Sequence, residues 1–134
     1  MRVVETDWWT LELPEEWEAE QEDELVVIED EDGVSCIEIS TLVRERGSVD
    51  DAELEEFSRE LREEGRRSTP VRIGEWQGLL FDYDDDDFHW REWYLRAGAH
   101  FLFVAYHCLP EHAGMDDAAV EEILSTLVRR AGDD

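Results

Sequence analysis

The stretch HFLFVAYHC, residues 100–108, is the most apolar segment of the chain and decides its fold. Successive side chains of a β-strand point to opposite faces of its sheet. Both sets of alternate positions are apolar here, namely Phe101, Phe103 and Ala105 on one side and Leu102, Val104 and Tyr106 on the other. A strand with two apolar sides is typical of the centre of a sheet that is covered on both faces.

The segments before this strand predict an antiparallel meander that leads up to it. Runs rich in aromatic and branched residues alternate with short breaks at Gly74, at Asp84 to Asp87 and at Gly98. Such breaks mark turns between strands. The strands of the meander are expected at residues 70–73, 76–83, 88–96 and 99–108.

The N-terminal third predicts three more strands. One covers residues 8–13 and stops at Pro14, which cannot donate a hydrogen bond to a neighbouring strand. The other two, residues 25–29 and 34–43, flank an acidic turn with the pair Asp32-Gly33, a common hairpin signal. Apolar residues occur on both sides of the strand at 34–43, so we expect both of its faces to be at least partly covered.

A helix is predicted in the middle of the chain. It opens at Ser48 or Asp50, either of which can cap it, and Gly65 is typical of a C-terminal stop. The remainder of this helix is mostly Glu and Arg, so a single apolar stripe should pack on the sheet. That stripe consists of Leu54, Phe57 and Leu61.

A second helix is predicted after the central strand, with Asp116 as its cap and with Met115 and Val120 as a hydrophobic staple. Arg129 and Arg130 would lie in its last turn, where the helix dipole favours cations. Its expected apolar stripe consists of Val120, Ile123, Leu124, Leu127 and Val128.

These elements together predict an α+β fold. We expect a mainly antiparallel sheet of about six to seven strands, with a mid-chain helix and a C-terminal helix packed on it. The length of 134 residues fits one domain, covering residues 1–134.

The charge of the chain predicts the conditions in which it works. It carries 38 Asp and Glu against 12 basic residues, all of them arginine, and its formal net charge is -26. Such a surface repels itself in dilute buffer, whereas at molar salt the Debye length falls to about 3 Å and screens the repulsion. We therefore expect a salt-adapted, halophilic protein whose carboxylates hold Na⁺ and K⁺ loosely. A GC-rich genome, which favours Arg over Lys codons, is the alternative explanation for the missing lysine.

The same composition limits the classes of partner and the cellular compartment that we expect for the protein. We expect no nucleic-acid partner, because a polyanion would meet a surface of its own sign. No apolar run has the length of a signal peptide or a membrane span. Cys36 and Cys108 are too few for a disulfide framework and are expected to be reduced, buried thiols. A cytoplasmic location is the expectation.

Three segments resemble the PsbP-like superfamily, which includes an extrinsic photosystem subunit and a nuclear-import factor that binds the GTPase Ran. The opening WTLELPEEW at residues 9–17 is similar to the family's strand, proline and tryptophan start, although Glu16 stands where the family often has Gly. The hairpin LVVIEDEDGVSCIEIS covers residues 25–40, and a central strand followed by a helix covers residues 100–127. The resemblance implies an α+β fold and a binding or accessory role, and it transfers no functional residue.

Candidate metal ligands are scattered along the sequence. The run Asp84 to Asp87 with His89 lacks the alternating ligands and the glycine of a calcium loop. His100 and His107 fall on opposite faces of their strand, while His107 and His112 could approach across a turn. Cys36 could meet His107 or Cys108 if their strands are neighbours, although a plain core contact is commoner. We predict no specific metal site and no cofactor.

No catalytic residue is assigned either. The chain has no GxSxG elbow, phosphate-binding loop or dinucleotide fingerprint. We therefore predict a binding or accessory module that recognises a protein partner of unknown identity. The alternatives are a small-molecule-binding protein or small enzyme with a pocket between sheet and helix, and a regulatory or toxin-neutralising protein.

Two sets of residues are candidates for the site. Alternation places Trp90, Glu92 and Tyr94 on one face of their strand, and Glu38 lies on one face of the strand at 34–43. If these faces meet under partial cover, they would line an aromatic pocket with a few polar groups; otherwise Trp90 and Tyr94 are core residues. The predicted interaction surface is Asp84, Asp85, Asp86, Asp87, His89 and Trp90, and the predicted pocket is Glu38, Glu92 and Tyr94.

Overall fold

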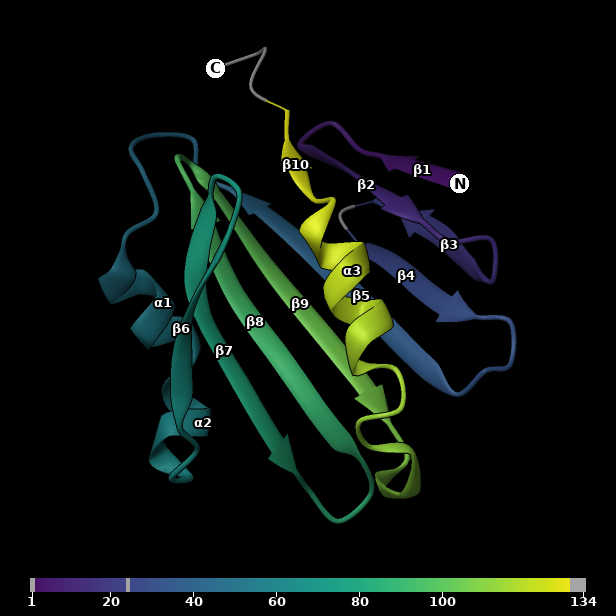
Figure 1. The fold of residues 1–134 in the computed structure, drawn as a ribbon. Coiled ribbons are helices and arrows are strands. Elements are labelled where there is room, and N and C mark those ends of the chain that lie inside the picture. The colour runs from purple at the N-terminus through teal and green to yellow at the C-terminus, as the bar shows by residue number, and fades with distance from the viewer. Residues whose placement is uncertain (1, 24, 131–134) are drawn as a thin grey trace.

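The computed structural model describes residues 2–23 and 25–130, which form two antiparallel sheets and short helices (Figure 1). A seven-stranded sheet has the order β3-β4-β5-β9-β8-β7-β6, and a three-stranded sheet has the order β1-β2-β10. The strands are β1 (Arg2–Glu5), β2 (Trp9–Leu13), β3 (Trp17–Glu22), β4 (Leu25–Asp30), β5 (Ser35–Val43), β6 (Ser68–Ile73), β7 (Trp76–Asp84), β8 (His89–Ala97), β9 (His100–Cys108) and β10 (Val128–Arg129). The helices are α1 (Asp51–Phe57), α2 (Arg59–Glu63), the 3-10 turn η1 (Pro110–His112) and α3 (Asp117–Ser125).

Strand β9 lies at the centre of the large sheet, as its sequence predicts. It pairs along its whole length with β5 on one side and with β8 on the other. The antiparallel meander β6-β7-β8-β9 and the hairpin β4-β5 are confirmed, and so is the α+β fold class. At Gly78 in β7, an added Cβ would lie 1.8 Å from the carbonyl oxygen of Tyr94, so only glycine permits this close pairing of β7 and β8.

Strands β1, β3 and β10 and the separate small sheet are not predicted from the sequence. Strand β3 contains only Trp17 and Ala19 as apolar residues, and four of its six residues are exposed, so its pattern does not stand out from a polar loop. Strands β1 and β10 are also short and mostly exposed. Their positions are set by pairing with β2 rather than by a hydrophobic pattern of their own.

The large sheet has one face that is covered over most of its strands, which we call the closed face. Here α3 and the small sheet lie across the strands, as Figure 1 shows. Trp9 of β2 is fully buried, and its indole Nε1 donates a hydrogen bond of 3.0 Å to the hydroxyl of Thr41 in β5. The buried residues of the large sheet in this core include Val26, Ile28, Ile37, Ile39, Trp93, Leu95, Leu102, Val104 and Tyr106.

The opposite face, which we call the open face, is covered only in part. Helices α1 and α2 cover it over β7, β8 and the start of β9, where Phe81, Tyr94 and Phe101 are buried in a second, smaller core. Phe57 of α1 lies on Phe101, with ring centroids 4.5 Å apart. Toward β5 and β4, the side chains of the open face are half-buried or exposed.

The mid-chain helix is two short helices rather than one. Asp50 caps α1 by accepting a hydrogen bond of 3.0 Å from the backbone N–H of Glu53, so of the two predicted caps it is Asp50 that is used. The break falls at Ser58, whose fully buried hydroxyl donates to the backbone carbonyl of Leu54 at 2.8 Å. Such back-bonding competes with the regular helical hydrogen bonds and bends the chain.

The C-terminal helix ends earlier than predicted, at Ser125. The backbone N–H of Glu12 donates to the hydroxyl of Thr126 at 2.8 Å, and Val128 pairs with Thr10 of β2. Pairing with the otherwise free edge of β2 therefore replaces the last helical turn. Val128 is 59% exposed, so it does not belong to the apolar stripe, and Arg129 and Arg130 do not lie in a helix.

The start of α3 also differs from the prediction. Asp116 occupies the N-cap position, but its side chain makes no capping hydrogen bond and instead accepts one of 2.5 Å from the hydroxyl of Ser35 in β5. Met115 is 66% exposed, whereas Val120 is fully buried, so the predicted staple does not form. Among residues 2–23 and 25–130, no helix is long and apolar enough to cross a membrane.

Candidate functional site

The register of β5, β9 and β8 brings the predicted pocket residues to the open face. Glu38 of β5 and Glu92 of β8 lie on either side of Ala105 in β9. In the next row, Ser40 and Tyr94 lie on either side of Phe103. The faces that the sequence predicted to meet are therefore parts of one sheet surface.

Helices α1 and α2 bury one part of this predicted pocket. Glu92 and Tyr94 are each 8% exposed, and the carboxylate of Glu92 accepts a hydrogen bond of 2.6 Å from the hydroxyl of Tyr83. Burial raises the pKa of Glu92 above its usual 4.5, an effect that the Tyr83 hydrogen bond opposes. Glu38 is half-buried outside this helical cover. Tyr94 is therefore a core residue, as in the second of the two interpretations of the sequence, whereas Glu38 remains accessible to solvent.

An aromatic group made of Phe88, Trp90 and His107 occupies the uncovered part of the open face. The ring centroid of His107 lies 4.9 Å from that of Trp90 and 5.0 Å from that of Phe88. The Phe88 and Trp90 centroids are 5.8 Å apart in an edge-to-face arrangement. All three side chains are half-buried. This packing is favourable for aromatic rings, and one side of the group stays in contact with solvent.

The acidic loop holds the aromatic group in place. The carboxylate of Asp85 accepts hydrogen bonds from the backbone N–H groups of Asp87 and Phe88 and, at 2.7 Å, from the indole Nε1 of Trp90. These bonds favour the ionised carboxylate and lower the pKa of Asp85. Asp85 therefore organises the turn and orients Trp90.

The residues of the predicted interaction surface do not share one face of the sheet. His89 lies on the opposite face of β8 from Trp90, and its Nδ1 lies 2.6 Å from a carboxylate oxygen of Asp84. Asp86 and Asp87 are exposed at the tip of the loop. Trp90 and Asp85 thus belong to the open face, whereas His89 with Asp84 belongs to the edge of the closed face.

One further set of residues meets on the open face beside the aromatic group. Cys36 of β5 pairs directly with His107 of β9, and Glu38 follows two residues later on the same side of β5. Ligand atoms of these three side chains all lie within 4.8 Å of one another. Burial, together with the negative charges of Glu38 and Glu29, raises the pKa of Cys36 to about 11. A meeting of Cys36 and His107 is among the possibilities that the sequence allows. Glu38 was not expected to join them, although the i, i+2 spacing on one strand could have indicated it.

The other candidate ligands do not join this set. Cys108 is buried on the closed face, where β9 pairs it with Ser35, and both cysteines are free thiols. His100 is buried near the start of β9 and accepts a hydrogen bond of 3.1 Å from Nε of Arg129. His112 lies in the 3-10 turn η1.

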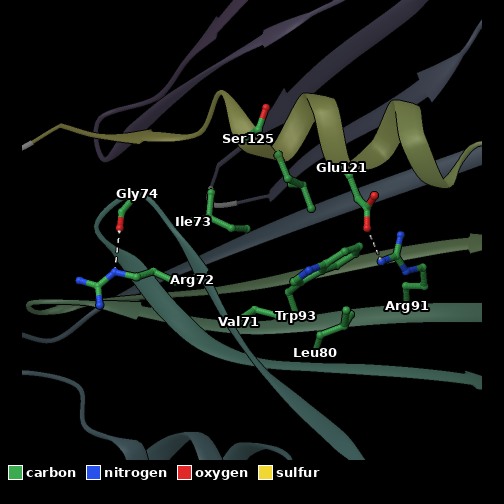
Figure 2. Close-up of a pocket in the computed structure, with 10 residues that line it drawn as sticks. Val71, Arg72, Ile73, Gly74, Leu80, Arg91, Trp93, Glu121 and Ser125 are labelled. Carbon is green, nitrogen blue, oxygen red and sulfur yellow. Dashed lines mark hydrogen bonds and ion pairs between the residues drawn. The ribbon is translucent and has the colours of Figure 1, made fainter.

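A cleft of about 420 Å³ opens between α3 and the β6-β7-β8 part of the closed face (Figure 2). Its floor is apolar and includes Val71, Leu80 and Trp93. Arg91 lies at its edge over the Trp93 ring, with its guanidinium carbon 4.9 Å from the ring centroid, and its Nη2 donates to Glu121 of α3 at 3.2 Å. Neither Glu38 nor Glu92 lines this cleft.

Arg91 is largely neutralised by its neighbours. Only 6% of its side chain is exposed, and carboxylate oxygens of Asp82 and Asp117 lie 3.6 and 3.7 Å from its guanidinium nitrogens. The hydroxyl of Ser125 donates to the backbone carbonyl of Glu122 at 2.6 Å. The cleft therefore combines an apolar floor with a charge-paired guanidinium whose Nε and Nη1 make no hydrogen bond in the described residues, which suits a small, largely apolar ligand.

Comparisons with known proteins show the fold alone. The chain matches no protein-family model and no curated protein. It is similar to the crystal structure of a protein from Bacteroides thetaiotaomicron VPI-5482, with a TM-score of 0.70 and 16% identity over 95% of this chain and 47% of that one. It is also similar to LpqN of Mycobacterium tuberculosis, a protein involved in cell envelope biogenesis, with a TM-score of 0.61 and 14% identity over 92% of this chain and 83% of that one. The chain thus spans about half the length of the Bacteroides protein.

Proposed function

We propose that the chain is a binding or accessory module that recognises a protein partner through its open face. The observation that carries the proposal is the half-buried aromatic group of Phe88, Trp90 and His107 on the part of the sheet that α1 and α2 leave uncovered. Aromatic side chains bury large areas at little cost in conformational entropy, and they are enriched at the centres of protein interfaces.

The charges around this group define the chemistry of the partner. Asp85 borders Trp90 on one side, and Glu29 and Glu38 lie beyond His107 on the other. A partner segment with an apolar anchor flanked by Arg or Lys would complement this surface. At molar salt these charges are screened, so the aromatic contacts would supply most of the affinity.

The proposal also includes the salt concentration and the cellular compartment in which the protein works. The net charge of -26 with no lysine supports a salt-adapted protein of the cytoplasm, with Na⁺ and K⁺ held loosely at the carboxylates. The resemblance to the PsbP-like superfamily supports a binding or accessory role, and the α+β fold is compatible with it.

The test is partner capture from native lysate at molar salt, with the tagged chain as bait and mass spectrometry as the readout. We expect a stoichiometric partner on the unaltered bait and at least a tenfold lower yield on Trp90→Ala, because a central aromatic residue contributes about 2 kcal/mol or more to an interface. Since Trp90 is half-buried, a second variant, Ser40→Arg, blocks the same face without removing an aromatic ring.

Met115→Ala is the matched control, because Met115 is an exposed apolar residue next to Asp116, which bonds Ser35 on the closed face. Circular dichroism and urea unfolding verify that each bait is folded. Capture of the same partner by folded Trp90→Ala and Ser40→Arg baits would show that the open face is not the binding surface.

The cleft between α3 and the sheet supports a second candidate function, the binding of a small apolar ligand. Its volume of about 420 Å³ lies in the range of ligand sites, and Trp93 forms part of its floor. A bait that returns no stoichiometric partner would contradict the protein-binding proposal and favour this one.

A further inference from the structure

We propose that Cys36, Glu38 and His107 form a binding site for a zinc ion on the open face. The three side chains are contributed by adjacent strands, Cys36 and Glu38 by β5 and His107 by β9. The register pairs Cys36 with His107, and the period of two places Glu38 on the same side of the sheet. The ligand set is therefore built by the two central strands of the fold rather than by a mobile loop.

The distances are close to those that a metal ion requires. Ligand atoms of the three residues lie within 4.8 Å of one another. Around a tetrahedral zinc ion, with bonds of about 2.0–2.3 Å, neighbouring ligand atoms are about 3.5 Å apart. Rotations about the side-chain bonds of Cys36 and Glu38 can supply the difference of about 1 Å, because both side chains are half-buried rather than fully packed.

The chemical types of the three ligand atoms determine which metal ion the site would prefer. A thiolate and an imidazole favour a borderline or soft ion over Mg²⁺ or Ca²⁺, which prefer oxygen ligands alone. Zinc accepts mixed sulfur, nitrogen and oxygen ligands, and sites with three protein ligands keep a fourth position open. The same residues therefore distinguish this site from the acidic loop, where carboxylates alone would hold a cation weakly.

The surroundings of His107 provide a second, independent observation. Its Nδ1 is buried and finds no hydrogen-bond partner in the part of the chain that the structure describes. Buried polar atoms without a partner are uncommon, and a metal ion bound through Nδ1 would give this atom the partner that it lacks. The Phe88 and Trp90 rings pack against the imidazole and fix its orientation, as a metal ligand requires.

The electrostatic environment also favours a cation. Glu29 of β4 pairs with Cys36 and adds a negative charge next to the three ligands. A divalent ion would offset the mutual repulsion of these groups and stabilise the thiolate of Cys36. The zinc site does not depend on the proposed protein partner, although an open fourth position would allow a partner side chain to complete it.

The experiment is a zinc titration of the purified full chain against a coloured chelator, in molar NaCl with excess Mg²⁺. The salt and the Mg²⁺ occupy the carboxylate surface, so only a site with sulfur and nitrogen ligands retains zinc. We expect one zinc ion per chain, and we expect Cys36→Ser, Glu38→Gln and His107→Gln each to weaken binding. Loss of a direct ligand should cost about 100-fold or more, since changes in the groups around metal ligands already cost 10- to 100-fold.

Cobalt substitution adds a spectroscopic signature that surface binding lacks. Co²⁺ in the site should give a thiolate charge-transfer band in the near ultraviolet, which disappears in Cys36→Ser. The matched controls are Cys108→Ala, which removes the thiol on the opposite face, and His112→Gln, which removes a histidine in η1. Absence of zinc binding under these conditions, or equal binding by Cys36→Ser and the controls, would overturn the proposal.

Discussion

Leu102 and Phe103 are neighbours in β9, but they belong to opposite sides of the sheet with different degrees of cover. Leu102 is fully buried in the core that contains α3 and the small sheet, whereas Phe103 is half-buried on the open face. The same alternation separates fully buried Ile39 from half-buried Ser40 in β5. One face of the central strands is thus packed in the main core, whereas the other leaves side chains accessible to solvent.

The largest test of this difference compares alanine substitutions at Leu102 and Phe103. Leu102→Ala should lower the free energy of unfolding by about 2–5 kcal/mol, because it creates a cavity in a packed core. Phe103→Ala removes more atoms, yet it should cost only about 1–2 kcal/mol, because its site can fill with water. Urea unfolding followed by tryptophan fluorescence measures both values. Equal losses would mean that the open face is packed as tightly as the closed one.

A smaller effect is expected from the hydroxyl groups of β5. Thr41→Val preserves shape but leaves the indole N–H of fully buried Trp9 without its acceptor, which should cost about 1–3 kcal/mol. Ser40→Val, on the half-buried side, should change stability by about 0.5 kcal/mol or less. The same unfolding measurements compare the two variants. A neutral Thr41→Val would show that the Trp9 hydrogen bond does not help to hold the small sheet on the closed face.

The smallest effect on stability is expected from the ionisation of Glu92, which lies in the part of the open face that α1 and α2 bury. Because burial raises its pKa above 4.5 in the folded state, ionising Glu92 costs more in the folded than in the unfolded chain. Stability of the unaltered chain should therefore fall relative to Glu92→Gln as the pH rises from 4.5 through the raised pKa, and the difference should then stay constant.

The measured quantity for Glu92 is the difference between the two proteins in free energy of unfolding at each pH. The other carboxylates contribute equally to both proteins and cancel. A difference that does not vary with pH would mean that Glu92 is solvated in the folded chain.

Six of the seven strands of the large sheet, all except β3, could be predicted because they carry their own hydrophobic patterns. The apolar residues of segment 100–108 and the turn residues of the meander each indicate an element without knowledge of its neighbours. Strands β1, β3 and β10 lack such patterns, and pairing alone determines them. The length of the C-terminal helix was mispredicted for the same reason, because the residues after Thr126 pair with the edge of β2 instead of continuing the helix.

The candidate site was predictable only within single strands. Alternation correctly placed Trp90, Glu92 and Tyr94 on one face, and the same rule separates His89 from Trp90. The set of Cys36, Glu38 and His107 depends on β5 lying next to β9 with one particular register. Strand order and register are properties of the whole fold, so the spacing of residues in the sequence does not contain them.

The pairing of β10 with β2 has a consequence for how the chain is made. The hydrogen bond between Thr126 and Glu12 joins residues 114 positions apart, and contacts so distant in sequence slow folding because the entropy of loop closure is lost before they form. Until residues 128–129 are synthesised, β2 pairs with β1 on one edge and has no partner on the other. The nascent chain therefore carries an open strand edge until β10 is synthesised, and unpaired strand edges make incompletely folded chains prone to aggregation.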